Sequence, residues 1–151
     1  MKKTRTELTR NALPTWLSFI HLYNLCISVL ESQLAAIGYT VSQYEALTHL
    51  YRDPGITQKE LASRCFVAKS GMSMLLKKME EDSWVVRTAD SNDARSKHLT
   101  LTSLGQKQVK KMLIVQTHVV NAMATPLTDK EIDVFKDTIK RIIESLKQIK
   151  N

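Results

Sequence analysis

The side chains best suited to bind a ligand lie on one face of the segment 69–79. If this segment is helical, hydroxyl and ammonium groups gather opposite an apolar stripe, with one methionine among them. This polar face consists of Lys69, Ser70, Ser73, Met74 and Lys77. Such groups near the start of a helix donate hydrogen bonds to phosphates and fit against base edges. The face is a candidate nucleic-acid contact surface, although for this helix alone a solvated surface beside a core stripe is the simpler explanation.

A charged hairpin follows this segment and favours the nucleic-acid interpretation. Residues 84–87 favour a strand, 89–97 are polar and rich in turn formers, and 98–101 return as a second strand. The charged residues on or near this hairpin are Arg87, Asp93, Arg95 and Lys97. Arginine is well matched to a narrow minor groove. Asp93 is placed to hold the Arg95 guanidinium in a fixed pose, or the two form a surface pair of little energetic consequence.

The elements that must position these residues are mostly helices. The sequence predicts them near 12–37, 42–52, 57–65, 69–82, 102–124 and 128–149. Capping boxes, in which a hydroxyl and a carboxylate satisfy end amides reciprocally, mark three starts: Ser42 with Glu45, Thr57 with Glu60, and Thr128 with Glu131. Gly38 ends the first helix, and the Asp-Pro-Gly turn at 53–55 separates the second from the third. We expect a mainly α fold with a small β-wing, in which 42–101 forms a winged helix-turn-helix region.

The first and last helices carry long apolar seams. Their residues step by three and four: Trp16, Ile20, Tyr23, Ile27, Leu30, Leu34 and Ile37 in one, and Ile132, Phe135, Ile139, Ile142, Leu146 and Ile149 in the other. A narrow seam of this kind suits another helix. Packing within the chain is one explanation, but a compact winged motif cannot cover both seams. We therefore expect 12–37 and 102–149 to be dimerisation helices of a single domain, 1–151.

Composition limits the class of protein. The chain has 151 residues, of which 43% are hydrophobic, with a net charge of +7. The charge suits a polyanion, but residues 53–97 hold eight basic and seven acidic side chains, a net charge of only +1. Cys26 and Cys65 have apolar neighbours and are expected to be small core residues. The apolar run at 12–30 is interrupted by polar residues, so we expect no membrane span, and the absence of a cleavable signal pattern predicts a cytoplasmic protein.

Catalytic motifs are missing from the sequence. It has no Gly-rich phosphate loop, no Cys-x-x-Cys, no His-Glu-x-x-His and no Gly-x-Ser-x-Gly. The four histidines lie on different predicted elements or lack ligand spacing. We expect no enzymatic activity, no metal and no cofactor.

Several motifs together resemble the MarR family of bacterial transcriptional regulators. They are Gln43-Tyr44, the segment 54–62, Asp-x-Arg at 93–95 and Leu-Thr-x-x-Gly within 99–105. The resemblance implies a homodimer that binds double-stranded DNA at a pseudo-palindromic operator, with repression the expected sign of regulation. It also implies release by a small aromatic or phenolic effector, bound between the dimerisation helices and the winged region. Candidate residues for that pocket are Trp16, His21, Tyr23, His49 and His118.

Three positions depart from the family pattern. Met74 stands where a polar or basic residue is usual, Gly71 where Ser or Thr is common, and Ser83 where a glycine usually precedes the wing. The first two affect the expected base preference. The near-neutral charge of 53–97 also keeps open an alternative class, a non-catalytic helical dimer that binds a protein partner. Salt-dependent retention on duplex DNA separates the two, because phosphate contacts release counterions.

Overall fold

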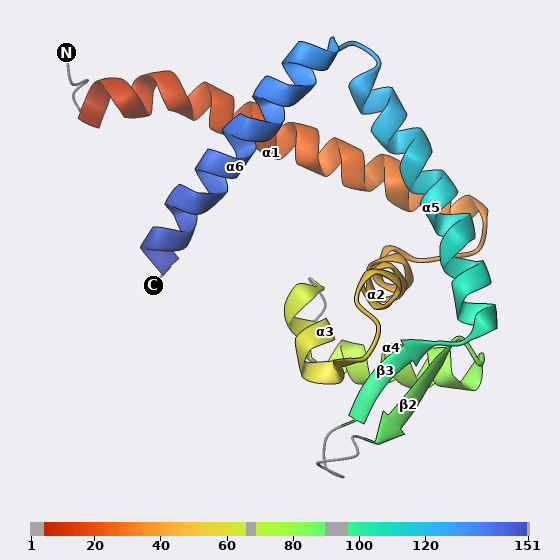
Figure 1. Ribbon diagram of the computed structural model, residues 1–151. Coiled ribbons are helices and arrows are strands. Elements are labelled where there is room, and N and C mark those ends of the chain that lie inside the picture. Colours follow the sequence, from red (N-terminus) through yellow and green to blue (C-terminus); the bar gives the residue numbers. More distant parts are fainter. Residues whose placement is uncertain (1–4, 66–68, 90–96, 151) are drawn as a thin grey trace. The chain divides into compact units, whose positions relative to one another are not determined.

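A computed structural model describes residues 5–65, 69–89 and 97–150 (Figure 1). Its elements, in chain order, are α1 (Arg5–Ala36), α2 (Val41–Arg52), β1 (Ile56–Thr57), α3 (Gln58–Arg64), α4 (Lys69–Glu81), β2 (Val85–Ala89), β3 (Lys97–Leu101), α5 (Ser103–Ala124) and α6 (Asp129–Lys150). The expected mainly helical fold with a small β-wing is confirmed. The chain divides into two compact units, Met1–Gln116 and Thr117–Asn151.

Two helix starts differ from the sequence prediction. The N-cap of α2 is Thr40 and not Ser42: its hydroxyl accepts from the Gln43 amide at 3.2 Å, and the Gln43 side chain accepts from the Thr40 amide at 2.9 Å. Two overlapping capping boxes fit this stretch, and the one nearer the turn at Gly38 forms. Gly38 has a φ of +83° and follows the end of α1, as expected. α1 begins at Arg5, before the expected position 12, and continues through Pro14.

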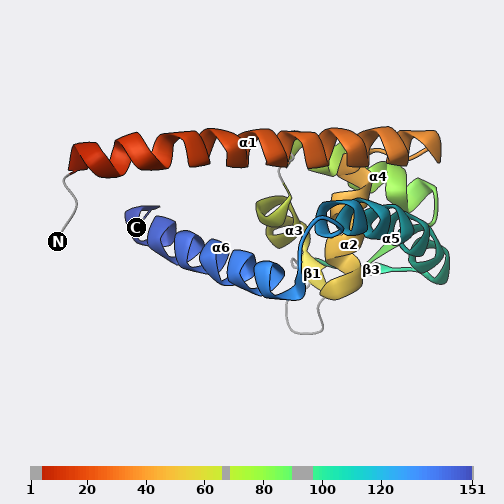
Figure 2. The same ribbon diagram turned by 90° about the horizontal axis from the view of Figure 1, so that it is seen from above.

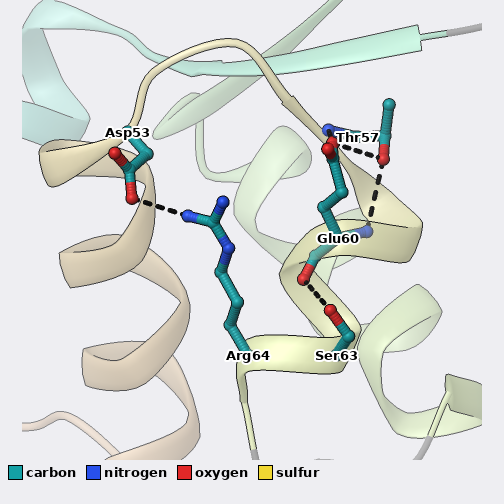
Figure 3. Close-up of polar contacts among 5 residues, drawn as sticks. All are labelled: Asp53, Thr57, Glu60, Ser63 and Arg64. Atoms are coloured by element: carbon teal, nitrogen blue, oxygen red, sulfur yellow. Dashed lines mark hydrogen bonds and ion pairs between the residues drawn. The ribbon is translucent and has the colours of Figure 1, made fainter.

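The turn into α3 is held by the predicted capping box (Figure 3). The Thr57 hydroxyl accepts from the Glu60 amide at 3.2 Å, while the Glu60 carboxylate accepts from the Thr57 amide at 2.7 Å. The amide and the hydroxyl of Thr57 both donate to the Glu60 carboxylate, and these two hydrogen bonds lower the pKa of Glu60. Arg64 at the other end of α3 pairs with Asp53, the C-cap of α2, with 2.6 Å between guanidinium and carboxylate. The start of α3 is thus fixed locally, and its end is tied back to α2.

Removing the Thr57 hydroxyl is expected to weaken the fold measurably. Thr57→Ala should lower the free energy of unfolding by about 1 kcal/mol, the usual effect of losing an N-cap. Urea denaturation measures this, with Ser63→Ala as the control, because the Ser63 hydroxyl only donates to the Glu60 carbonyl of its own helix. The Glu60 carboxylate contributes to the free energy of unfolding above the ordinary glutamate pKa. This contribution is lost as the pH falls through the lowered pKa that Glu60 has in the folded protein. Equal stability of Thr57→Ala and Ser63→Ala would contradict the expectation.

The sheet has three antiparallel strands in the order β1-β3-β2. The predicted hairpin is confirmed as β2 and β3, which pair from Val85 with Leu101 to Ala89 with Lys97. The third strand was not predicted: β1 pairs Ile56 with Leu99. The Gly55 amide also donates to the Leu99 carbonyl at 2.9 Å. Because β1 directly precedes α3, the wing is attached by backbone hydrogen bonds to the segment that leads into α3.

The core lies within the first unit. The fully buried large side chains are Leu34, Leu47, Leu50, Leu61, Met72, Leu76, Met79, Val85, Leu99, Val109 and Met112. The apolar stripe of α4 contributes Met72, Leu76 and Met79 to this set. Leu75, the fourth residue of the stripe, is half-buried. The opposite face of α4 is therefore the one available to a ligand.

The root of the wing is locked to the start of α5. The Thr102 hydroxyl accepts from the Gly105 amide at 3.0 Å and donates to the Ser83 carbonyl at 2.6 Å, while the Thr102 amide donates to the Trp84 carbonyl at 3.0 Å. Ser83 has a positive φ of 59°, which explains why a glycine is usual at this position of the family pattern. The Trp84 ring packs at a tilt against Tyr39, with 6.0 Å between centroids.

The apolar surface of α1 is larger than the sequence analysis expected. The stretch Ala12–Ala36 has a mean hydropathy of 1.4 and is long and apolar enough to cross a membrane by length and composition alone. We expected the polar residues in this stretch to keep the apolar run too short to span a membrane. That expectation was wrong, because these polar residues are almost all uncharged. Within this stretch only Leu30 and Leu34 are buried in the chain. Figure 2 shows α1 as one long helix, and its buried residues Leu30 and Leu34 lie near the C-terminal end.

The second unit consists of the end of α5, a short connection and α6. The Thr128 capping box is confirmed: the Glu131 carboxylate accepts from the Thr128 amide at 2.8 Å, and the Thr128 hydroxyl accepts from the Glu131 amide at 3.3 Å. The Thr128 amide and hydroxyl both donate to the Glu131 carboxylate at 2.8 Å, and these two hydrogen bonds lower the pKa of Glu131. Most of the α6 seam is exposed, including Ile142, Leu146 and Ile149.

Candidate nucleic-acid interface

The exposed face of α4 carries the groups expected to contact nucleic acid. Ser73, Met74 and Lys77 all point away from the core, and Met74 is 76% exposed. Lys69 and Ser70 lie in the first turn of the same helix, where their side chains are outside the described part of the chain. Since the opposite face is buried, α4 presents a hydroxyl, a thioether and an ammonium group side by side.

The two lysines in the second half of α4 are held differently. The Lys77 ammonium lies 4.0 Å from the Glu81 carboxylate, at the limit of an ion pair, and its side chain is 79% exposed. The Lys78 ammonium donates to Asp82 at 2.9 Å, and this hydrogen bond raises the pKa of Lys78. Exposed pairs contribute little to stability. Lys77 is thus the more loosely held cation, and it shares a face with Ser73.

Arg87 on β2 is engaged within the protein. Its Nε donates to Glu80 Oε1 at 2.8 Å, and its Nη1 donates to Gln58 Oε1 at 2.9 Å. The sequence placed Arg87 among the nucleic-acid contacts. In the structure these two donors connect the wing strand to the end of α4 and to the start of α3.

Gln58 is a site residue that the sequence analysis missed. Its Nε2 donates to Ser73 Oγ at 2.7 Å, and its Oε1 accepts from Arg87. The partners lie 15 and 29 residues away in the sequence, so no local pattern predicts the contacts. Through Gln58, the exposed hydroxyl of α4 is linked to the wing.

The wing tip falls outside the described residues, and with it Asp93 and Arg95. Lys97 is described: it is the first residue of β3, pairs with Ala89 in the sheet, and is exposed. Lys97 thus lies at the end of β3 that faces the last residue of β2.

The candidate effector residues lie on three helices. Trp16, His21 and Tyr23 are exposed on α1, and His49 is half-buried on α2. His118 is exposed on α5, in the second unit. Within the described residues, no three His, Cys, Asp or Glu side chains are grouped to hold a metal ion.

Cys65 occupies a core position. Burial, with a smaller effect of the Glu45 carboxylate, raises the pKa of the Cys65 thiol to about 11. The thiol is therefore protonated at neutral pH, and thiolate chemistry is disfavoured. Cys26 on α1 is half-buried, and both cysteines are free.

Two short helices, α3 and α4, followed by an antiparallel wing whose strand β3 pairs with β1 directly before α3, define a winged helix-turn-helix protein. The model of the MarR family matches residues 37–96, which span this motif from the end of α1 to the wing. The resemblance to the MarR family drawn from the sequence motifs is thus confirmed over these residues.

Similar proteins agree with this assignment. The HTH-type transcriptional repressor Rv2887 of Mycobacterium tuberculosis is 31% identical over 81 residues, 54% of this chain and 58% of that protein. The chain thus spans little more than half the length of this curated relative. A MarR-family regulator from Silicibacter pomeroyi has a similar structure, with a TM-score of 0.77 at 20% identity over 95% of this chain and 96% of that one.

Two further solved structures contain ligands. A cysteine-to-serine mutant of MarR from E. coli, complexed with operator DNA, matches with a TM-score of 0.73 at 20% identity over 89% of this chain and 97% of that one. Rv2887, complexed with p-aminosalicylic acid, matches with a TM-score of 0.69 at 23% identity over 83% of this chain and 95% of that one. At these identities the similarity establishes the fold.

Proposed function

We propose that this protein is a cytoplasmic, non-enzymatic transcriptional regulator that binds double-stranded DNA as a homodimer and represses its target genes. Each subunit would place α4 in the major groove of one half of a pseudo-palindromic operator, with the wing beside it. The contact residues would be Lys69, Ser70, Ser73, Met74 and Lys77 on α4, with Arg87, Asp93, Arg95 and Lys97 on the wing.

The observation that carries this proposal is the exposed face of α4. A helix whose far side is fully buried presents Ser73, Met74 and Lys77 together, and the wing strands are attached beside it. The E. coli MarR mutant of the same fold was solved with operator DNA, which supports the same use here. The match of residues 37–96 to the MarR family model supports it further.

The homodimer is proposed on the two exposed seams. On α1, Trp16 is 55% and Tyr23 46% exposed, and on α6, Ile142 is 53% and Leu146 54% exposed. Apolar stripes of this size are unfavourable in water and mark interfaces. A second copy of the chain is the partner that supplies matching stripes, and this also accounts for the long apolar stretch of α1.

An aromatic or phenolic effector is proposed for the pocket expected beside the dimerisation helices. Rv2887 binds p-aminosalicylic acid, a small aromatic acid, in its solved complex. The side chains proposed to line the pocket here are Trp16, His21, Tyr23, His49 and His118. Their rings and imidazoles suit stacking and hydrogen bonding to a phenol.

Lys77 provides a direct test of DNA binding. A duplex of about 30 base pairs, three helical turns, is first enriched from a randomised pool by the wild-type protein, and its affinity is measured by fluorescence anisotropy at several salt concentrations. Lys77→Ala should weaken binding several-fold and make the salt dependence shallower by about one counterion per subunit. The control is Lys78→Ala, which removes the same charge about a quarter turn around the helix, where it is paired with Asp82.

Failure to enrich any duplex would overturn the proposed function and favour the helical dimer that binds a protein partner. Identical salt slopes for the wild type and both lysine variants would instead show that α4 does not lie against the phosphates.

A further inference from the structure

Four side chains around α4 are linked by three hydrogen bonds into one polar network. Arg87 bridges Glu80 and Gln58 with bonds of 2.8 and 2.9 Å, and Gln58 donates to Ser73 at 2.7 Å. Glu80 and Ser73 are both on α4, seven residues and therefore about two turns apart. This network thus joins Ser73 and Glu80 on α4 to the wing strand β2 and to the first residue of α3.

The donors and acceptors of these side chains fix the direction of each of the three hydrogen bonds. Arginine has only donors, so Gln58 must turn its carbonyl oxygen toward Arg87. The Gln58 amide nitrogen then faces Ser73, and because this nitrogen only donates, the Ser73 oxygen accepts. The Ser73 proton is left for another acceptor, and the side chain lies on the exposed face of the helix.

We propose that Gln58 and Arg87 are positioning residues that hold Ser73 as an outward hydrogen-bond donor, so that each subunit selects an acceptor on the DNA. That acceptor is a phosphate oxygen or an acceptor atom on a base edge in the major groove. The inference rests on the proposed function. It assigns to Arg87 a role in orienting Ser73 through Gln58, in addition to the DNA contact expected from the sequence.

Gln58→Glu reverses the polarity with almost no change in shape. A carboxylate accepts from Arg87 as before, but it also accepts from Ser73, so the hydroxyl proton turns inward. Gln58 is the first residue of α3, where a carboxylate is favoured by the helix dipole, so the fold should tolerate the change. The added negative charge weakens DNA binding by itself, and a second background must separate this effect.

The experiment is a double-mutant cycle with Ser73→Ala, using the enriched duplex of about 30 base pairs. Gln58→Glu should weaken binding about tenfold more in the wild type than in the Ser73→Ala background, the usual effect of one hydrogen bond. Gln58→Met releases Ser73 without turning its hydroxyl inward, so it should weaken binding by about threefold, less than Gln58→Glu does. Thermal unfolding of the free proteins, expected to be similar, excludes a purely structural effect.

The variant Ser73→Ala also identifies the acceptor. Weaker binding at one base position of each half-site indicates a base edge, whereas a uniform loss over all sequences indicates a phosphate. Equal effects of Gln58→Glu in both backgrounds would overturn the inference alone, and so would Gln58→Met binding as weakly as Gln58→Glu. No enriched duplex at all would overturn both the inference and the proposed function.

Discussion

Gly105→Ala is expected to destabilise the fold by about 3 kcal/mol or more, at the upper end of the range for overpacking. A Cβ at this position would lie 2.0 Å from the Trp84 carbonyl oxygen and 2.9 Å from its carbon. The Trp84 carbonyl cannot withdraw freely, because it accepts from the Thr102 amide, and Thr102 is also bound to the neighbouring Ser83 carbonyl. Since whole domains have a stability of only about 5–15 kcal/mol, the loss is a large fraction of the total.

Urea denaturation at a fixed protein concentration measures this effect, because the proposed dimerisation would make the apparent stability depend on concentration. The matched control is Gly38→Ala, which places a Cβ in open space at a φ of +83° and should cost only about 1–2 kcal/mol. If Gly105→Ala is no less stable than Gly38→Ala, then the start of α5 and the Trp84 carbonyl can move apart with no loss in the free energy of unfolding. The close approach at Gly105 would then be irrelevant to stability.

Gly105 belongs to a motif that can be identified in the sequence but whose physical cause cannot be read there. The Leu-Thr-x-x-Gly motif was identified as part of the family resemblance, and the structure gives it a physical cause. Thr102 caps α5 and binds the wing root, and the glycine three residues later leaves room for the Trp84 carbonyl. A close approach between distant backbone segments leaves no local signal other than the glycine itself.

The predictable features were those set by local residues. The helices lie close to where the sequence predicts them. They were predicted from the capping boxes at Thr57 and Thr128, from the Asp-Pro-Gly turn at 53–55, and from the apolar and polar faces of α4. The strand β1 was missed because its two residues pair only with β3, more than 40 residues away. The Arg87 partners were missed for the same reason, since the fold alone brings Glu80 and Gln58 to the guanidinium.

Leu146→Glu is expected to disrupt the proposed homodimer. The Leu146 side chain is 54% exposed in the single chain, and the seam to which it belongs is proposed to be buried by the second copy. Losing one buried leucine removes about 2–3 kcal/mol of apolar burial, and a two-fold interface loses it twice. Burying the new carboxylate costs more. The dimer dissociation constant should rise by at least about a thousandfold, because each 1.4 kcal/mol is a factor of ten.

Sedimentation velocity over a range of protein concentrations measures this shift, and Gln148→Glu is the matched control. It adds the same charge to the same turn of α6, but on the face opposite the seam, where no partner is expected. The control should remain as dimeric as the wild type, and its circular dichroism should match that of Leu146→Glu. Two variants with the same dissociation constant would show that this seam does not bind the second copy. The exposed stripe of α1 would then need a different partner, because water alone does not explain an apolar surface of that length.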